Sequence, residues 1–226
     1  MGLPERLVWK YRRLTHLASD YRAGLSLREY YRDGYRVMRG PNDIEFKLRL
    51  NLRDRSISGT LLRDSWWDQV SSNFIISHTQ RGMTVVDVGA NVGFFTVLMA
   101  KLVGEAGSVH AFEPEITNFS VLEENVRLNE LRNVQLHNVV AGKHDGRTSF
   151  YTPLEHTNGR AYKSDGEDWR NIIERQVAIN RLDTILDGKK IDVLKVDTEG
   201  MDLDVLEGME GAMQNKMILV IEVWPS

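Results

Sequence analysis

The sequence predicts an α/β fold in which a mostly parallel sheet carries helices on both faces, with an N-terminal extension before it. From Thr84 onward, apolar β-branched runs alternate with helical patterns, which is the order of βαβ units. The first run leads directly into a glycine turn that opens a helix, Asp87-Val88-Gly89-Ala90-Asn91-Val92-Gly93. Strands that alternate with helices predict a parallel sheet with right-handed crossovers.

Composition bounds the class of protein. The 226 residues suit one domain with an extension, and 42% hydrophobic with 27% charged residues is ordinary for a globular chain. Residues 1–63 hold 14 Lys and Arg against 7 Asp and Glu, and the remainder 15 against 25, so a basic arm precedes an acidic body. The absence of cysteine excludes disulfides, thiolate metal sites and thiol nucleophiles. No signal-peptide pattern and no apolar run of membrane-span length occur, so we expect a cytoplasmic protein.

We expect residues 1–80 to form a helical cap and a β-hairpin. Residues 3–22 repeat apolar side chains near a helical period, with Arg and Lys between them. Residues 46–52 alternate strictly between apolar and polar, and residues 57–62 follow a turn as the expected partner strand. Tyr-Arg pairs recur in the arm and are compatible with binding to bases or a lipid surface, but a packed cap is the preferred interpretation.

The second predicted unit, residues 81–226, alternates strands and helices. The expected strands are 84–88, 109–112, 134–140, 191–196 and 217–224, and the expected helices are 94–103, 116–131 and 201–213. Between the third and fourth of these strands, a variable insertion at about 147–175 has strand-like ends and an irregular polar middle. Such an insertion is either a disordered loop or a lid that faces the substrate.

The strongest functional signal is the glycine turn together with Glu113. Glycines permit a tight turn and close backbone approach, and the helix start offers N–H groups to a ligand. No Lys follows as a phosphate-binding P-loop requires, and Asn91 replaces the second glycine of a dinucleotide fingerprint. Glu113 ends the next strand, 20 residues after Gly93, where a carboxylate can accept both ribose hydroxyls. The alternative is a glycine turn with an ordinary surface glutamate.

With Phe112-Glu113-Pro114, Asn125 and Asn129, this turn resembles the FkbM family of methyltransferases. Further blocks agree with the resemblance, which covers roughly residues 46–224: Leu182-Asp183-Thr184-Ile185, then Ile191 to Gly200, then Val205-Leu206-Glu207-Gly208. The resemblance implies a class I methyltransferase fold and S-adenosylmethionine as donor, with S-adenosylhomocysteine as product. It also implies a hydroxyl acceptor on a sugar, glycolipid or polyketide-type small molecule.

The resemblance also implies roles for residues at matching positions. Asp197 would end the fourth strand beside the transferring methyl, with Glu199 entering the next helix, and residues 138–145 would face the adenine. We therefore take Asp197 and Glu199 as catalytic candidates, although both are also compatible with capping that helix. His144 and His156 are alternative bases, and no metal is predicted, although the two carboxylates and a histidine would suit magnesium. The expected cofactor-binding residues are Asp87, Gly89, Ala90, Asn91, Gly93, Phe94, Thr96, Glu113 and Pro114.

Two departures from the family pattern affect the expected fold. Asp202 stands where the family usually has a glutamate, and its side chain is shorter. The sequence also stops after the strand 217–224, so the family's closing C-terminal strands are expected to be missing and this apolar strand lies at a sheet edge. Because an apolar edge is an association hazard, we expect the N-terminal hairpin, or a second protomer in a homodimer, to cover it.

The main functional prediction is O-methylation by in-line displacement, in which a carboxylate or histidine takes the proton of the acceptor hydroxyl. One alternative is a non-catalytic cofactor-binding partner protein that retains the sheet but not the acceptor site. A second alternative is an RNA methyltransferase that uses the Tyr-Arg arm to bind phosphates. The acidic body argues against a nucleic-acid partner.

Overall fold

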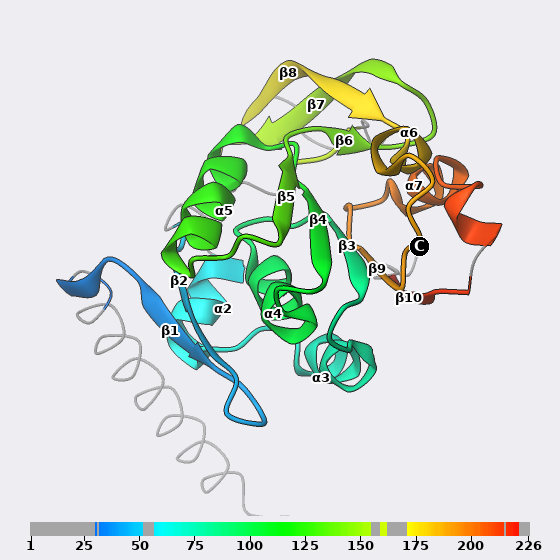
Figure 1. Ribbon diagram of the computed structural model, residues 1–226. Coiled ribbons are helices and arrows are strands. Elements are labelled where there is room, and N and C mark those ends of the chain that lie inside the picture. The colour runs from blue at the N-terminus through cyan, green and yellow to red at the C-terminus, as the bar shows by residue number, and fades with distance from the viewer. Residues whose placement is uncertain are drawn as a thin grey trace, which may run out of the picture.

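The computed structural model describes residues 30, 32–51, 57–154, 159–161, 171–214 and 216–221. At its centre lies a five-stranded sheet in the order β10-β9-β3-β4-β5, and every pairing within it is parallel (Figure 1). The strands are β3 (Thr84–Val88), β4 (Ser108–Phe112), β5 (Val134–His137), β9 (Val193–Val196) and β10 (Ile218–Ile221). This arrangement confirms the predicted α/β class with a mostly parallel sheet.

Helices cover both faces of the central sheet. One face packs against α3 (Gln69–His78), α4 (Phe94–Val103) and α5 (Ile116–Leu128), and the other against α6 (Leu182–Leu186) and α7 (Asp202–Glu207) (Figure 1). Because side chains alternate along a strand, Val85 joins the apolar cluster on the first face and Val86 the cluster on the second. Burial on both faces explains why these strands are almost continuously apolar.

The strand order reverses next to β3, which has β4 on one side and β9 on the other. In open parallel sheets, ligands bind outside the carboxyl ends of the strands at such a switch point. The glycine turn after β3, the residue Glu113 after β4 and Asp197 after β9 all lie at this edge. The topology therefore gathers the three motifs that the sequence placed far apart.

The N-terminal hairpin differs from the prediction in its partner strand. The structure pairs β1 (Arg36–Arg39) with β2 (Glu45–Leu48), whereas residues 57–62, predicted as a strand, belong to the helix α2 (Ile57–Asp64). In α2 the buried residues are Ser58, Leu61 and Leu62, which share one face at helical spacing. The predicted partner strand was therefore wrong, because six residues are too few to show whether the apolar side chains follow the strand or the helix period.

Asn125 of α5 and Asn129, the C-cap of this helix, attach the hairpin to the body. The Asn125 side chain accepts from Arg49 N and donates to Arg49 O and Val92 O, and the Asn129 amide bonds both backbone groups of Lys47. The β1–β2 hairpin consequently packs on α4 and α5. Among the described residues β1 and β2 form a sheet of their own and do not pair with β10, so the hairpin does not extend the central sheet at that edge, and cover of the edge by a second protomer stays a prediction. The described residues of the hairpin share an apolar cluster with α4 and β3. The boundary between the two predicted units, at residue 80, stays a prediction.

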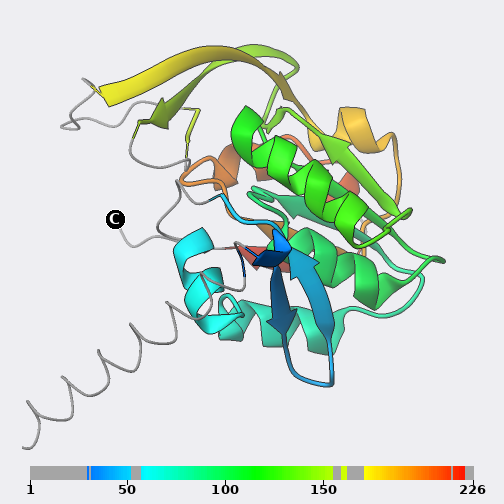
Figure 2. The ribbon, with the colours of Figure 1, turned by 90° about the vertical axis from the view of Figure 1, so that its left-hand side faces the viewer.

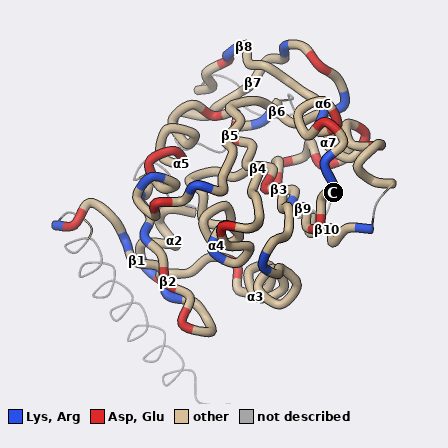
Figure 3. The backbone as a smooth tube through the Cα atoms, viewed as in Figure 1, with Lys and Arg blue, Asp and Glu red and all other residues tan. Residues whose placement is uncertain are grey.

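The insertion forms a β-hairpin over its described residues. A three-stranded sheet of order β6-β8-β7 contains β6 (Val140–Ala141), β7 (Gly146–Pro153) and β8 (Ile172–Asn180), and its long antiparallel arm projects from the body (Figure 2). Residues 155–158 and 162–170 lie outside the described residues, as do the predicted cap at 3–22 and the last residues of the predicted strand 217–224. In the view of Figure 3, Lys and Arg are interspersed with Asp and Glu over the described chain.

Candidate functional site

A pocket opens at the carboxyl ends of β3, β4 and β9. It holds about 630 Å³ of space, including its open mouth. One wall comes from the ends of these strands and the other from β6, β7 and residues 159–161. The predicted site residues that line the pocket are Gly89, Asn91, Glu113, Pro114, Asp197 and Glu199.

The glycine turn forms the floor of this pocket through tight backbone contacts. Gly89 has φ +77°, and a Cβ there would overlap the carbonyl oxygen of Asp197, so the ends of β3 and β9 meet only because this residue is glycine. Asn91 also adopts a left-handed conformation, with φ 51°. Its Oδ1 accepts from Val92 N at 2.8 Å, a local bond that helps asparagine to adopt this region.

The backbone amides of the turn are bonded within the protein. Gly89 N and Ala90 N each donate to Phe112 O at 3.0 Å, and Gly93 N donates to Ala90 O. Asn91 N donates to Glu113 Oε2 at 2.8 Å. The expectation that the turn presents free N–H groups to a ligand was therefore wrong for residues 89–93. The turn offers a closely approachable backbone surface instead.

Glu113 provides the acceptor group at the centre of the pocket wall. The residue is 6% exposed, and its two carboxylate oxygens accept one amide each, from Asn91 N at 2.8 Å and Glu115 N at 2.9 Å. Burial raises the pKa of Glu113 to about 7, although the two amide bonds oppose the shift. A carboxylate has about four lone-pair sites, so these two bonds leave capacity for further donors. A ribose diol, with two hydroxyl donors, fits this group.

Beneath the turn and outside the pocket lining, Asp87, Thr96 and Lys195 form a buried polar cluster that reaches Asp197 at the pocket. Asp87 is 0% exposed, and its Oδ2 accepts from Thr96 Oγ1 at 2.6 Å. Lys195 Nζ lies 3.4 Å from Asp87 Oδ1 and 3.5 Å from Asp197 Oδ2. Burial disfavours the charged form of Lys195, but the two carboxylates outweigh it and raise its pKa above the usual value. Asp87 and Thr96 thus support the site from below.

Lys195 is a site residue to which the sequence analysis assigned no role. It interrupts the buried strand β9 and extends under the turn, where it also lies over the Phe95 ring. The available signal was a lysine within an otherwise apolar strand, two residues before a candidate catalytic aspartate. Lysine is almost never fully buried unless it is paired, so its position required a carboxylate partner nearby.

Asp197 and Glu199 lie on the loop between β9 and α7. Glu199 has φ 54°, an uncommon conformation for a non-glycine residue, and Gly200 follows with φ +106°. Asp202, which replaces the family's usual glutamate, accepts from Thr198 N and Oγ1 at 3.2 and 2.7 Å and so closes this loop. The N-cap of α7 is Met201 with no side-chain bond, so neither candidate is the N-cap residue of that helix.

The wall opposite the glycine turn is largely apolar. Residues 139–141, Phe150 and Ala161 line it, and the Asn138 amide holds the neighbouring loop by donating to Glu113 O and Pro114 O. Of the predicted adenine-facing range 138–145, only the first half therefore lies at the pocket. Asp145 bonds Asn180, Arg181 and Thr184 instead. The alternative base His144 is exposed outside the pocket lining, and His156 lies outside the described residues.

The remaining predicted residues pack behind the pocket. Ala90 and Gly93 belong to the turn but do not line the pocket, and Phe94 packs with Phe46 and Trp66 in an aromatic cluster.

Among the described residues no three His, Cys, Asp or Glu side chains gather as a metal site. Within the same residues, no helix has the length and apolar character needed to span a membrane.

Comparisons with known proteins identify the family of this chain. The family model of the methyltransferase FkbM domain matches residues 87–225, more than half of the chain. Methyltransferase 1 of Beauveria bassiana (strain ARSEF 2860) is 28% identical over 145 residues, which is 56% of this chain and 58% of that protein. Methyltransferase sdnD of Sordaria araneosa is 28% identical over 171 residues, which is 62% of this chain and 66% of that protein. The chain thus spans less than two thirds of either relative.

Two solved structures share less sequence identity with this chain than these relatives do. A SAM dependent methyltransferase from Aquifex aeolicus shares 17% identity over 66% of this chain and 62% of that chain, with a TM-score of 0.39. An rRNA methylase from Streptococcus thermophilus shares 15% identity over 67% of each chain, with a TM-score of 0.42. The family assignment comes from the sequence match, which begins at the glycine turn and contains Glu113, Asp197 and Glu199. This chain belongs to the FkbM family of methyltransferase domains.

Proposed function

We propose that this chain binds S-adenosylmethionine in the pocket at the switch point and methylates a hydroxyl oxygen of a small-molecule or glycan acceptor. The observation that carries the proposal is the buried Glu113 carboxylate, which lines the pocket with lone pairs left for a diol. Family membership supports the same donor. The acceptor class is an expectation of the family resemblance.

The chemistry of the lining suggests how the nucleoside would lie. Glu113 would accept the ribose hydroxyls, and the apolar wall of residues 139–141 and Phe150 suits an adenine ring. The opposite end of the pocket, between Gly89 and Asp197, would receive the methionine portion. The bound cofactor supplies an electrophilic methyl group on a sulfonium sulfur.

The residues of the chain would align the acceptor and accept its proton. In-line displacement requires the hydroxyl oxygen, the methyl and the sulfur to lie on one line, so most of the catalytic effect would come from positioning. A neutral hydroxyl is a weak nucleophile, and a carboxylate within hydrogen-bond reach improves it by taking the proton during attack. Asp197 lines the pocket and is held from behind by Lys195, so we assign it this role, with Glu199 beside it.

Calorimetric titration with S-adenosylhomocysteine tests the proposal without knowledge of the acceptor. We expect the wild-type protein to bind with a micromolar dissociation constant and Glu113→Ala to lose most of the affinity. The exposed Glu123 on α5 provides the matched control, and Glu123→Ala should bind like wild type. Thermal melts establish that both variants fold. A folded wild-type protein that gives no heat with this nucleoside would refute the proposal.

Turnover separates the enzyme from a partner protein that only binds the cofactor. Formation of S-adenosylhomocysteine from S-adenosylmethionine, measured over a library of sugars, glycolipids and polyketide alcohols, should rise with at least one of them. Asp197→Asn should lower that rate by about 100-fold or more while nucleoside binding persists, which is the usual effect of losing a general base. Binding without turnover on any hydroxyl compound would favour the non-catalytic alternative.

A further inference from the structure

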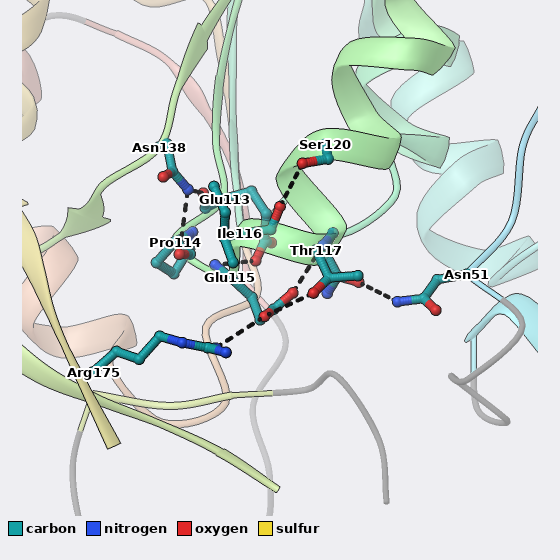
Figure 4. Close-up of polar contacts among 10 residues, drawn as sticks. Asn51, Glu113, Pro114, Glu115, Ile116, Thr117, Ser120, Asn138 and Arg175 are labelled. Atoms are coloured by element: carbon teal, nitrogen blue, oxygen red, sulfur yellow. Dashed lines mark hydrogen bonds and ion pairs between the residues drawn. The ribbon is translucent and has the colours of Figure 1, made fainter. Parts of the chain in front are cut away.

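An arginine of the projecting hairpin reaches the segment that holds Glu113. Arg175 of β8 places Nη1 3.5 Å from Glu115 Oε1, and Figure 4 shows its side chain crossing from the hairpin to the start of α5. Arg175 pairs in register with Phe150 of β7. Because directly opposed residues of an antiparallel pair point to the same face, the Arg175 and Phe150 side chains both face the body of the protein.

Glu115 connects this arginine to the ribose-binding carboxylate. Its own carboxylate is 2% exposed, caps α5 by accepting from Asn118 N at 2.8 Å, and accepts from Thr117 Oγ1 at 3.3 Å. Its backbone N–H donates to Glu113 Oε1 at 2.9 Å. One residue thus touches the hairpin with its side chain and Glu113 with its backbone.

The hairpin itself supplies part of the pocket wall. Phe150, Gly159 and Ala161 line the pocket together with residues 139–141, on the apolar side. Residue 160 pairs with Tyr151 through two backbone bonds of 2.8 and 3.0 Å, which holds Gly159 so close to Phe150 that a Cβ there would overlap the ring. These contacts bring the insertion to the end of the pocket that suits adenine.

We infer that Arg175 is a positioning residue for the nucleoside: it seats the β7–β8 hairpin on Glu115, so that Phe150 closes the adenosyl end of the pocket beside Glu113. The inference rests on the proposed binding of S-adenosylmethionine. It assigns the described part of the insertion to recognition of the donor, whereas the sequence left open a disordered loop or a lid that faces the substrate. Arg175 acts through Glu115 and Phe150 and does not itself line the pocket.

Two adenosyl probes test this role. S-adenosylhomocysteine has the adenosyl and amino-acid ends, whereas 5′-methylthioadenosine has only the adenosyl end. We expect Arg175→Met to weaken the binding of both probes by the same factor, about three- to tenfold, since Arg175 is half exposed and the Glu115 carboxylate is buried. Arg175→Lys, which retains the charge, should restore part of the affinity. A general loss of structure would not be rescued by lysine.

The chain offers a matched control and a second variant. Arg147 lies on the same hairpin and donates to Gln176 O, so Arg147→Met should leave both affinities unchanged. Glu115→Gln keeps the backbone donor to Glu113 and an oxygen to cap α5, and should weaken the probes as Arg175→Met does. The double variant should lose little more affinity than either single variant, because both substitutions remove the same interaction between Arg175 and Glu115. Melting temperatures check that each variant folds.

Three outcomes would overturn the inference. If the wild type binds and Arg175→Met binds both probes within twofold of it, Arg175 has no positioning role. If Arg175→Met weakens the binding of S-adenosylhomocysteine but not that of 5′-methylthioadenosine, the residue acts on the amino-acid end of the ligand. If the folded wild type binds neither probe, the proposed function fails and the inference fails with it, a result distinct from the first two.

Discussion

The carboxyl group of Glu113 sits at the boundary between protein and pocket, and its protonation controls what it can accept. Burial raises its pKa to about 7, and only the ionised form accepts hydrogen bonds at both oxygens from a diol. At pH 8 the group is mostly ionised, whereas at pH 6 it must lose a proton before it binds. Affinity for S-adenosylhomocysteine should therefore fall about tenfold from pH 8 to pH 6.

Calorimetry in buffers of different ionisation enthalpy checks this prediction. Binding near pH 6.5 should release protons, and the release should vanish near pH 8.5. Glu113→Gln cannot ionise, so its weaker binding should vary little over the same range. Equal affinities of the wild type at pH 6 and pH 8 would show that Glu113 is not the group that meets the nucleoside.

The buried cation beneath the turn makes a second prediction at the level of single residues. Lys195→Met leaves the fully buried Asp87 beside a neutral side chain and should lower the free energy of unfolding by roughly 3–5 kcal/mol, since an unpaired buried charge is costly. Asp87→Asn combined with Lys195→Met removes both charges and should regain most of the loss. Urea unfolding measures the free energy of unfolding of the single and the double variant, and Lys143→Met, at an exposed lysine, is the control. A single variant as stable as wild type would contradict this account.

At the scale of elements, the sequence predicted best where the pattern was long or bounded by glycines. Helix α4 begins and ends as expected, because Gly93 and Gly104 flank ten mostly apolar residues that are buried on nearly every side. Helix α2 was mistaken for a strand, because a segment of six residues with only Ile57, Leu61 and Leu62 apolar is too short to separate the two periods. The arm β7–β8 was only partly predicted, since long-range antiparallel pairing leaves little trace in a largely exposed segment such as the first half of β8.

The attachment of the β1–β2 hairpin to α5 is testable through Asn125. Its amide satisfies backbone groups of Arg49 and Val92 within the buried interior, so Asn125→Ala leaves these groups without a partner. We expect a loss of roughly 2–4 kcal/mol in the free energy of unfolding, larger than for the more exposed Asn129→Ala. Chemical denaturation of the two variants gives the comparison. Equal, small losses would mean that the hairpin is held by its apolar contacts alone.

At the scale of the whole molecule, the parallel topology explains which part of the site could be predicted. Residues after β3, β4 and β9 meet because carboxyl ends of parallel strands share one edge, so Gly89, Glu113 and Asp197 followed from local motifs. Phe150 and Ala161 were missed because a separate sheet brings them to the pocket from an insertion. The position of such an arm depends on contacts such as Arg175 to Glu115, which no local pattern encodes.

The edge strand β10 carries the remaining prediction, a homodimer. Among the described residues β10 pairs only with β9, and Leu219 on it is 40% exposed. An apolar edge strand presents unpaired backbone groups to a second chain, and a lysine on such an edge opposes pairing. We therefore expect the protein to form a dimer in light-scattering measurements at micromolar concentration and Leu219→Lys to shift it toward monomer. The control Leu203→Lys, on the exposed face of α7, should leave the mass unchanged. A wild-type protein that stays monomeric at high concentration would mean that the β10 edge does not pair with a second copy, and Leu219→Lys would then have no effect on mass.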